Sequence, residues 1–260
     1  MKAATTPVKA LLRWPGGKRR LVKTLLPLVP EDAECFCEVF AGSAALTLAK
    51  ERHPVEVLND LNGDIVALMR NAHFHLPALM EEMSWFVASR KDLHDFKAQP
   101  GLTEIQRAAR FLLRNRISFG GGGTSFGVAK TKGGVGFDRD EIGQRLEAVR
   151  KRLNKVVIEN LSYERCLQLY DAPTTVFFLD PPYVGPSTGA YEGFTQAQMG
   201  ELRVRLDKLQ ARWLLTVNDS PDNRALFGDC CMRQVATGNR LRNNRTTKAA
   251  TFGELIITRE

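Results

Sequence analysis

The sequence predicts an α/β fold with a mainly parallel sheet and helices on both of its faces. Apolar runs bounded by turn residues predict strands near residues 34–39, 55–59, 155–159, 175–180, 212–217, 231–236 and 252–258. Helical patterns lie between most of these runs, and such alternation is typical of a parallel sheet that is covered on both sides. The chain of 260 residues is long enough for one large domain, or for one domain that carries a sizeable insertion.

The first predicted strand leads into a turn that a ligand can approach. A Phe-Ala-Gly turn follows this strand and precedes a helical run over 44–52, so Gly42 lies where a strand passes into a helix. Asp60 stands eighteen residues after Gly42, at the end of the next strand. In nucleotide-binding α/β sheets an acid at this place accepts hydrogen bonds from ribose hydroxyls. Asp60 is equally suited to capping a helix that begins near Leu61.

The strand pattern stops between residues 71 and 154, where the chain becomes helical, then glycine-rich, then helical again. This predicts an inserted second domain over 71–154, with 1–70 and 155–260 forming the domain of the sheet. Residues 101–160 carry twelve lysines and arginines against six acids, so most of the net charge of +8 lies in this part of the chain. An excess of positive charge favours a polyanionic partner.

The clearest helix is predicted between Thr195 and Arg212, with Thr195 as its N-cap. The strand ahead of it ends in Asp180-Pro181-Pro182-Tyr183. Because prolines fix φ at about −65° and restrict the residue before them, this segment is expected to leave the strand and to have a rigid backbone. Ligands of open α/β sheets bind beyond the carboxyl ends of the strands. A carboxylate, a backbone carbonyl and an aromatic ring there suit an exocyclic amine on a flat ring, although Asp-Pro also simply ends strands in many folds.

The order of four segments resembles that of the Dam-like (D12, or alpha) class of DNA adenine N6-methyltransferases. These segments are Arg13-Trp14-Pro15-Gly16-Gly17-Lys18, Phe40-Ala41-Gly42-Ser43-Ala44, Asn59-Asp60-Leu61-Asn62 and Asp180-Pro181-Pro182-Tyr183. The resemblance extends from Leu12 to about Ile257. It implies a Rossmann-like methyltransferase sheet with an inserted, mainly helical target-recognition domain. It also implies S-adenosylmethionine as the methyl donor, no metal, and a flipped adenine in double-stranded DNA as the acceptor.

The resemblance implies a cofactor site built from three of the segments and the start of the fourth. The expected cofactor-binding residues are Trp14, Gly16, Gly17, Lys18, Phe40, Gly42, Asp60 and Asp180. Lys18 is expected to pair with the carboxylate of the cofactor; the alternative is a buried Trp14 and a solvated Lys18 on a loop. Ala44 replaces the second glycine of the family's usual Phe-x-Gly-x-Gly pattern. We expect its methyl group to be tolerated at a helix start, at the risk of looser cofactor binding.

The expected catalytic residues are Asp180, Pro181, Pro182 and Tyr183. The amine nitrogen of adenine is a poor nucleophile, because its lone pair is delocalised into the ring. If the Asp180 carboxylate and the Pro181 carbonyl accept its two N–H bonds, the nitrogen is biased toward tetrahedral geometry and its lone pair can face the methyl group. Tyr183 would stack on the base. Such a reaction cannot occur inside a paired duplex, so the base must be extruded.

Two basic stretches are expected to bind DNA. The first begins with Arg114-Asn115-Arg116 at the end of a helix and continues through a glycine-rich segment over 119–126 with two phenylalanines. The second, over 233–248, contains no acid. The expected DNA-binding residues are Arg114, Asn115, Arg116, Lys130, Lys132, Arg240, Arg242 and Arg245. Positive groups with interleaved aromatic rings suit phosphates and unstacked bases, although such a loop in isolation is more often a solvated surface. The first stretch departs from members that methylate GATC, so that recognition sequence is not assumed.

Other classes of protein fit the sequence less well. The five cysteines and four histidines lack the spacing of a disulfide framework or a metal site. The Gly-Gly-Lys segment lacks the remaining residues of a phosphate-binding P-loop. No apolar run of about eighteen residues or secretory signal is present, so we expect a cytoplasmic protein, nucleoid-associated or phage-encoded in a bacterial host. We expect a monomer, or a transient dimer on DNA. The alternatives are an RNA adenine or DNA cytosine-N4 methyltransferase, or a non-catalytic DNA-binding relative.

Overall fold

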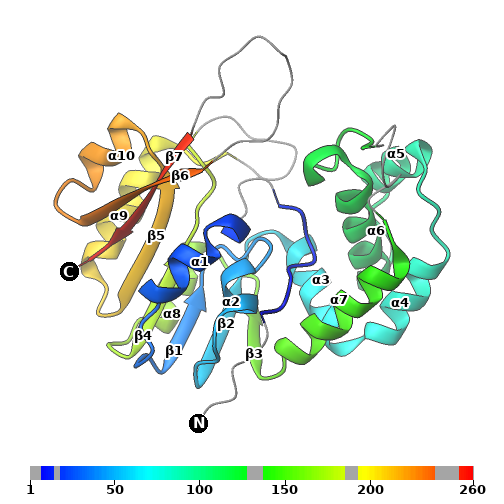
Figure 1. The fold of residues 1–260 in the computed structure, drawn as a ribbon, viewed down its shortest axis with the longest axis horizontal. Helices are drawn as coiled ribbons and strands as arrows, with labels where there is room; N and C mark the ends of the chain where they lie inside the picture. Colours follow the sequence, from blue (N-terminus) through cyan, green and yellow to red (C-terminus); the bar gives the residue numbers. More distant parts are fainter. Residues whose placement is uncertain (1–6, 15–17, 128–136, 185–192, 238–251, 260) are drawn as a thin grey trace.

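The computed structural model describes residues 7–14, 18–127, 137–184, 193–237 and 252–259. Within them, seven strands form one sheet in the order β3-β2-β1-β4-β5-β7-β6 (Figure 1). The strands are β1 (Cys35–Glu38), β2 (Val55–Asn59), β3 (Val156–Glu159), β4 (Thr175–Leu179), β5 (Arg212–Asn218), β6 (Cys231–Thr237) and β7 (Phe252–Thr258). Each strand lies where the sequence predicts one.

The strand pairing confirms a mainly parallel sheet. The five strands from β3 to β5 run parallel to their neighbours, whereas β7 runs antiparallel between β5 and β6. On one side of β1 the sheet continues to β2 and β3, and on the other side to β4 and β5. The direction of the strand order therefore changes between β1 and β4. In open α/β sheets ligands bind beyond the carboxyl ends of the strands at such a point.

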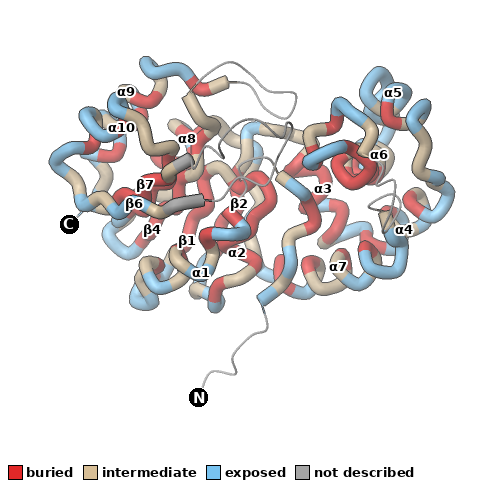
Figure 2. The backbone as a smooth tube through the Cα atoms, turned by 45° about the horizontal axis from the view of Figure 1, so that its top comes forward, coloured by how far each residue is buried: buried red, intermediate tan, exposed pale blue. Residues whose placement is uncertain are grey.

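Helices cover both faces of the sheet, because alternate side chains of each strand point to opposite faces. In β4, Phe177 and Leu179 pack with α8 (Tyr163–Tyr170), α9 (Gln196–Lys208) and α10 (Pro221–Leu226). Val176 and Phe178 pack on the other face with α1 (Val22–Leu25), the 3₁₀ turn η2 (Leu26–Leu28) and α2 (Ala45–Ala49). All of β4 is buried, which explains its unbroken apolar sequence. Figure 2 shows buried residues along the strands and exposed residues on the outer sides of the helices.

The predicted start of α9 is confirmed. The hydroxyl of Thr195 accepts a hydrogen bond from the backbone N–H of Gln198 at 3.1 Å. The side chain of Gln198 accepts one from the backbone N–H of Thr195 at 2.8 Å. This capping box satisfies two backbone donors that the first helical turn leaves without partners.

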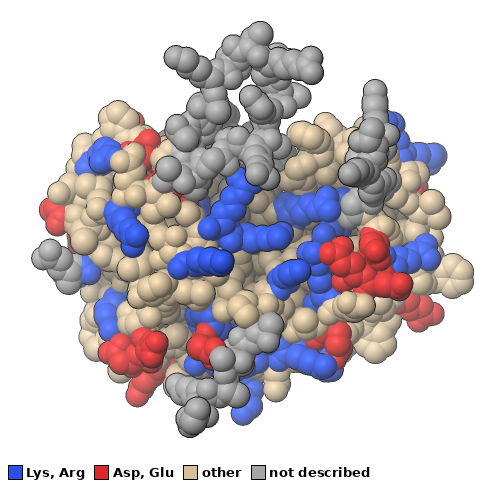
Figure 3. Space-filling model, in the orientation of Figure 1, with Lys and Arg blue, Asp and Glu red and all other residues tan. Residues whose placement is uncertain are grey.

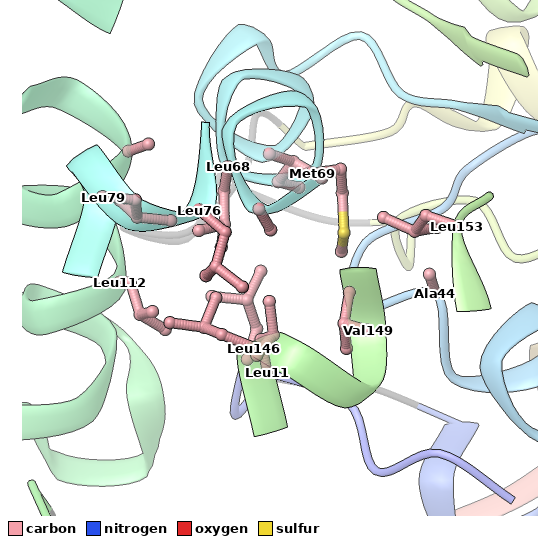
Figure 4. Close-up of a cluster of buried hydrophobic side chains, with 14 of the residues drawn as sticks. Leu11, Ala44, Leu68, Met69, Leu76, Leu79, Leu112, Leu146, Val149 and Leu153 are labelled. Atoms are coloured by element: carbon pink, nitrogen blue, oxygen red, sulfur yellow. The ribbon is translucent and has the colours of Figure 1, made fainter. Parts of the chain in front are cut away.

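A bundle of helices stands beside the sheet (Figure 1). It contains α3 (Gly63–Phe74), α4 (Leu76–Ser84), α5 (Arg90–Ala98), α6 (Glu104–Ile117) and α7 (Arg139–Arg152). The expected domain boundary at residue 70 falls inside α3. Side chains from α3, α4, α6 and α7 share one apolar cluster with Leu11 and Ala44 (Figure 4). The bundle and the segments that surround the first turn of the sheet therefore share a core.

Two charged side chains hold the middle residue of the short helix α2, Thr47. Glu38, at the end of β1, accepts hydrogen bonds from the hydroxyl and from the backbone N–H of Thr47, the latter at 3.0 Å. Arg152, at the end of α7, donates to the carbonyl of Thr47 at 2.6 Å and forms an ion pair with Glu56 at 2.6 Å. These contacts fix the helix that follows the Gly42 turn. The helix spans only five residues, fewer than the predicted run over 44–52.

Ala44 immediately precedes α2 and adopts a left-handed conformation, with φ of +54°. This conformation costs an L-residue roughly 1 kcal/mol or more and favours glycine, which the family usually has at this position. The Ala44 side chain is fully buried in the cluster of Figure 4. Burial of the methyl group contributes roughly 0.8 kcal/mol and offsets much of the backbone cost.

The pH dependence of stability should reveal the buried carboxyl of Glu38. Burial raises its pKa from 4.5 to about 7, although the hydrogen bonds from Thr47 oppose the shift. A carboxyl whose pKa is higher in the folded state stabilises the fold below its unfolded pKa, and this contribution is lost as the pH rises through the folded pKa. The free energy of unfolding should therefore fall less between pH 5 and pH 8 in Glu38→Gln than in the wild type, by about 2 kcal/mol.

Urea unfolding at the two pH values measures this difference. Glu34→Gln, which changes an exposed carboxylate near the same strand, is the matched control and should behave like the wild type. Equal pH dependence in Glu38→Gln and the wild type would show that Glu38 is already ionised in the fold at pH 5.

Within the described residues, no helix is long and apolar enough to cross a membrane. The same part of the chain contains no group of three or more His, Cys, Asp or Glu side chains that could hold a metal ion.

Candidate active site

The turns after β1, β2 and β4 bring most of the described site residues to one edge of the sheet. Phe40 and Gly42 follow β1, Asp60 follows β2, and Asp180 follows β4. These strands are parallel neighbours, so their carboxyl ends lie at the same edge. The fold thus confirms that the Asp-Pro-Pro-Tyr segment follows the carboxyl end of a buried strand, and it adds that this strand lies where the strand order changes direction.

A buried cluster of polar side chains surrounds Asp180. Lys18, in the 3₁₀ turn η1 (Lys18–Arg20), places its Nζ 2.7 Å from Asp180 Oδ1 and 3.6 Å from Glu254 Oε2. Thr216 of β5 donates a hydrogen bond to the same Asp180 oxygen at 2.9 Å. The hydrogen bond and the ion pair that Asp180 forms among the described residues are both to Oδ1, and neither involves Oδ2. We call Lys18, Asp180, Tyr183, Thr216 and Glu254 the Lys18 cluster.

Tyr183 is held within this cluster by its hydroxyl group. The hydroxyl donates to Glu254 Oε1 at 2.6 Å, and Lys18 Nζ lies 5.2 Å from the centre of the tyrosine ring, within cation–π range. Pro181 is buried and Pro182 half-buried. Glu254 was not predicted as a site residue. The signal for it is an acid inside the apolar strand 252–258, which points to a buried partner.

Burial and charge act against each other in the cluster. Burial raises the pKa of Asp180, and the neighbouring Lys18 ammonium opposes this shift. Burial alone would lower the pKa of Lys18, but the attraction of Asp180 and Glu254 outweighs it and the pKa is raised. Burial also raises the pKa of Tyr183, which keeps its hydroxyl protonated as a donor. Lys18 is therefore a buried cation between two carboxylates, rather than a solvated loop residue.

The Gly42 turn is tied to Asp60 and covered by Trp14. Asp60 accepts hydrogen bonds from the backbone N–H groups of Gly42 at 2.7 Å and Asn62 at 2.8 Å. Gly42 has a φ of +50°, and a Cβ at this position would lie 3.1 Å from the Trp14 ring. The alternative role of Asp60 as a helix cap is wrong, because α3 begins at Gly63 and its N-cap is Asn62. Burial raises the pKa of Asp60.

Asn115 joins the Trp14 segment to the helical bundle. Its side chain accepts from the backbone N–H of Arg13 at 2.8 Å and donates to the carbonyls of Arg13 at 3.0 Å and Gly121 at 2.9 Å. Gly121 has a φ of +80°, and a Cβ there would lie 1.9 Å from the carbonyl oxygen of Arg13, so only glycine permits this approach. Asn115 was predicted to contact DNA, but here both of its amide hydrogens are used within the protein.

A small pocket lies beside this junction. It has a volume of about 100 Å³ and is lined by Trp14, Asn62, Asp64, Phe111, Arg114, Asn115, Gly121, Gly122 and Gly123. Burial lowers the pKa of Arg114, one of the predicted DNA contacts.

Phe40 was expected to bind the cofactor, but its side chain packs in the apolar core. Its ring centre lies 5.7 Å from that of Tyr163 and 6.3 Å from that of Phe194.

Arg116 is buried among other arginines. It is 2% exposed, and its Nε and Nη2 have no hydrogen-bond partner among the described residues. Its pKa is lowered to about 10, mainly by burial and in addition by the nearby positive charges of Arg145, Arg13 and Arg19. Arg13 and Arg19 are exposed members of the group. They were not predicted as DNA contacts, although the Lys18-Arg19-Arg20 run is a visible basic signal.

Lysine and arginine side chains gather across the middle of one face of the molecule, between the sheet and the helical bundle (Figure 3). The predicted residues Gly16, Gly17, Lys130, Lys132, Arg240, Arg242 and Arg245 lie outside the described residues.

The chain is similar to known DNA methyltransferases over most of its length. It is 25% identical to the type II methyltransferase M1.LlaDCHI of Lactococcus lactis subsp. cremoris, over 96% of this chain and 95% of the relative. It is 27% identical to a DNA adenine methylase of Vibrio cholerae serotype O1, over 91% of each chain. It is also 26% identical to the type II methyltransferase M.CviBI of Paramecium bursaria Chlorella virus NC1A, over 68% of this chain and 69% of the relative.

A family model also matches most of the chain. It describes the D12 class N6 adenine-specific DNA methyltransferases and matches residues 14–220, which include the segments around Trp14, Gly42, Asp60 and Asp180. The sheet and its flanking helices are those of a Rossmann-like methyltransferase. The chain therefore belongs to the D12 class of N6 adenine-specific DNA methyltransferases.

Proposed function

We propose that the protein transfers a methyl group from S-adenosylmethionine to the N6 amine of an adenine flipped out of double-stranded DNA. The main support is the environment of Asp180. Lys18 and Thr216 hold its Oδ1, while its Oδ2 accepts no hydrogen bond from the described residues. A fixed carboxylate with one oxygen available is suited to accepting an N–H of an amine that enters beyond the end of β4.

The residues around β1 and β4 fit the proposed cofactor. S-adenosylmethionine supplies its methyl group from a positively charged sulfur, and the Lys18 cluster has two carboxylates for one lysine. Trp14 packs closely on the Gly42 turn, and the backbone of this turn carries no side chain at Gly42. We propose that Asp60 holds the ribose, because each carboxylate oxygen can accept a second hydrogen bond. Lys18, which has three N–H donors, would also bind the carboxylate of the cofactor.

The protein's own groups would orient the target amine. Asp180 Oδ2 and the carbonyl of Pro181 accept its two hydrogens and direct the nitrogen lone pair toward the methyl group. Tyr183, held by Glu254, would stack on the flipped base. When the new carbon–nitrogen bond forms, the nitrogen must release one proton. The raised pKa of Asp180 makes this carboxylate a better acceptor for it.

The basic face between the sheet and the bundle is the proposed DNA surface (Figure 3). Arg13 and Arg19 are exposed beside the buried Arg116 and belong to the turn segments next to the Lys18 cluster. We further propose that the helical bundle with its glycine-rich segment recognises the target sequence, and that the protein acts in the cytoplasm as a monomer or a transient dimer on DNA.

Salt dependence of DNA binding tests the position of this surface. Arg19→Ala should lower the slope of log affinity against log salt by about one unit, equally for different sequences, because one phosphate contact is lost. Arg212→Ala is the matched control. This arginine is 44% exposed, but it stands at the amino end of β5, away from the carboxyl ends of the strands that carry the site. Equal slopes for wild type and Arg19→Ala would place the DNA on another face.

The function as a whole is tested by incubating methyl-free genomic DNA with the protein and S-adenosylmethionine, followed by sequencing that detects modified bases. N6-methyladenine within one sequence motif is the expected result. Modification of cytosine instead, or methylation of RNA but not of DNA in a parallel reaction that contains RNA, would overturn the proposed acceptor.

A further inference from the structure

Glu254 lies in β7, beyond the residues 14–220 that the family model matches. It reaches the Lys18 cluster because β7 pairs directly with β5, which carries Thr216. One carboxylate oxygen of Glu254 accepts the Tyr183 hydroxyl at 2.6 Å, and the other lies 3.6 Å from Lys18 Nζ. Its side chain is 8% exposed. Two functions of this residue can be separated, a hydrogen bond to Tyr183 and a negative charge beside Lys18.

The hydrogen bond alone does not require an acid, since a glutamine of the same length also offers an acceptor oxygen to a tyrosine hydroxyl. The charge is the distinguishing property. The ammonium of Lys18 is shared between Asp180 and Glu254, with the shorter contact to Asp180. Tyr183 adds no charge while its hydroxyl is protonated. The cluster therefore holds one positive and two negative groups in a place where water is largely excluded.

An excess of negative charge in such a place is costly unless a cation approaches it. Charges interact there more strongly than at the surface, because the effective dielectric constant is lower. The proposed methyl donor carries a sulfonium cation, whereas S-adenosylhomocysteine, the product left after transfer, carries a neutral thioether. The amino-acid and nucleoside parts of the two molecules are the same.

We propose that Glu254 determines the preference of the cofactor site for the sulfonium cation over the neutral thioether. This inference rests on the proposed use of S-adenosylmethionine and assigns a specificity-determining role to a residue of β7. Glu254 shares the Lys18 ammonium with Asp180 and supplies the second negative charge. Binding of the donor adds the positive charge of its sulfonium beside the two carboxylates, a charge that the neutral thioether lacks.

Isothermal titration calorimetry with three ligands tests the proposal. S-adenosylmethionine has the sulfonium, sinefungin has an ammonium-bearing carbon in its place, and S-adenosylhomocysteine is neutral there. The wild type should bind both charged ligands more tightly than the neutral one. Glu254→Gln should lower the affinity ratio of S-adenosylmethionine to S-adenosylhomocysteine by about tenfold, mainly through weaker binding of the charged ligand.

Glu159→Gln is the matched control. Glu159 of β3 accepts the hydroxyl of Tyr170 at 2.6 Å, the same kind of contact without a lysine, and its replacement should leave the ratio unchanged. Tyr183→Phe removes the hydrogen bond but not the charge of Glu254, and should also retain the ratio.

Two results would overturn the proposal. One is an unchanged ratio in Glu254→Gln, whatever happens to the separate affinities. The other is a wild-type protein that binds the neutral ligand as tightly as the two charged ligands, a measurement that does not depend on the folding of any variant. Failure of the wild type to bind any of the three ligands would instead overturn the proposed cofactor.

Discussion

Replacement of Asp180 by asparagine should nearly abolish methyl transfer while the protein remains folded. Asparagine keeps the size of the side chain but has a single acceptor oxygen. Lys18 and Thr216 already bind Oδ1 of the native residue, so they would take that oxygen and turn the amide NH₂ toward the target amine. The N–H donors of the asparagine amide would then face the N–H donors of the target amine. We expect a loss of about 2–4 kcal/mol or more in transition-state stabilisation, as for removal of one group from an oxyanion hole.

Single-turnover methylation of a DNA substrate with saturating cofactor measures this effect, and DNA binding should remain close to that of the wild type. Asp229→Asn, which neutralises an exposed carboxylate paired with Arg203, is the control for loss of one negative charge. A moderate change in cofactor affinity is compatible with the role of Asp180, because it borders the proposed cofactor site. Methylation by Asp180→Asn at nearly the wild-type rate would place the chemistry elsewhere.

Replacement of Lys18 by methionine should strongly destabilise the fold. Methionine fills a similar volume without a charge, so the carboxylates of Asp180 and Glu254 would remain in the cluster without their shared cation. Removal of one partner from a buried ion pair typically costs about 3–5 kcal/mol, because an uncompensated charge stays buried. The free energy of unfolding, from urea denaturation at pH 7.5, should fall by about this amount.

Lys91→Met is the matched control for the same substitution. Lys91 forms an ion pair with Asp95 on α5, but its side chain is 82% exposed. Water screens such a pair, so its loss should hardly change the free energy of unfolding. A loss of stability in Lys18→Met no larger than in Lys91→Met would mean that water reaches the Lys18 cluster.

The accuracy of the sequence prediction differs between local and distant features. All seven strands were predicted, because buried strands are short apolar runs between turn residues. The bounds of α2 were not, since this helix is held at Thr47 by Glu38 of β1 and by Arg152 of α7, and the latter lies far along the chain. The polar residues of the site also differ in how far local sequence predicts them. Asp180 was recognised from its own tetrapeptide, whereas Glu254 stands alone in an apolar strand.

Asn115 illustrates what a local pattern cannot distinguish. An asparagine between two arginines at a helix end fits a DNA contact as well as it fits a structural role. The structure shows that its hydrogen bonds reach Arg13, more than a hundred residues earlier in the chain. Its expected role in DNA binding, like those of Arg114 and Arg116, stays a prediction that binding measurements must decide.

The sequence by itself determined the α/β class, the strand positions, the start of α9 and the motifs that mark the family, because periodicity, proline and capping residues act over a few neighbours. Only the tertiary structure decided which charges meet. Lys18 finds Asp180 and Glu254 because β7 lies next to β5 in the strand order, and that order places residues from both ends of the chain at one edge of the sheet. Pairing between distant residues depends on the packing of whole strands and helices, which no short stretch of sequence specifies.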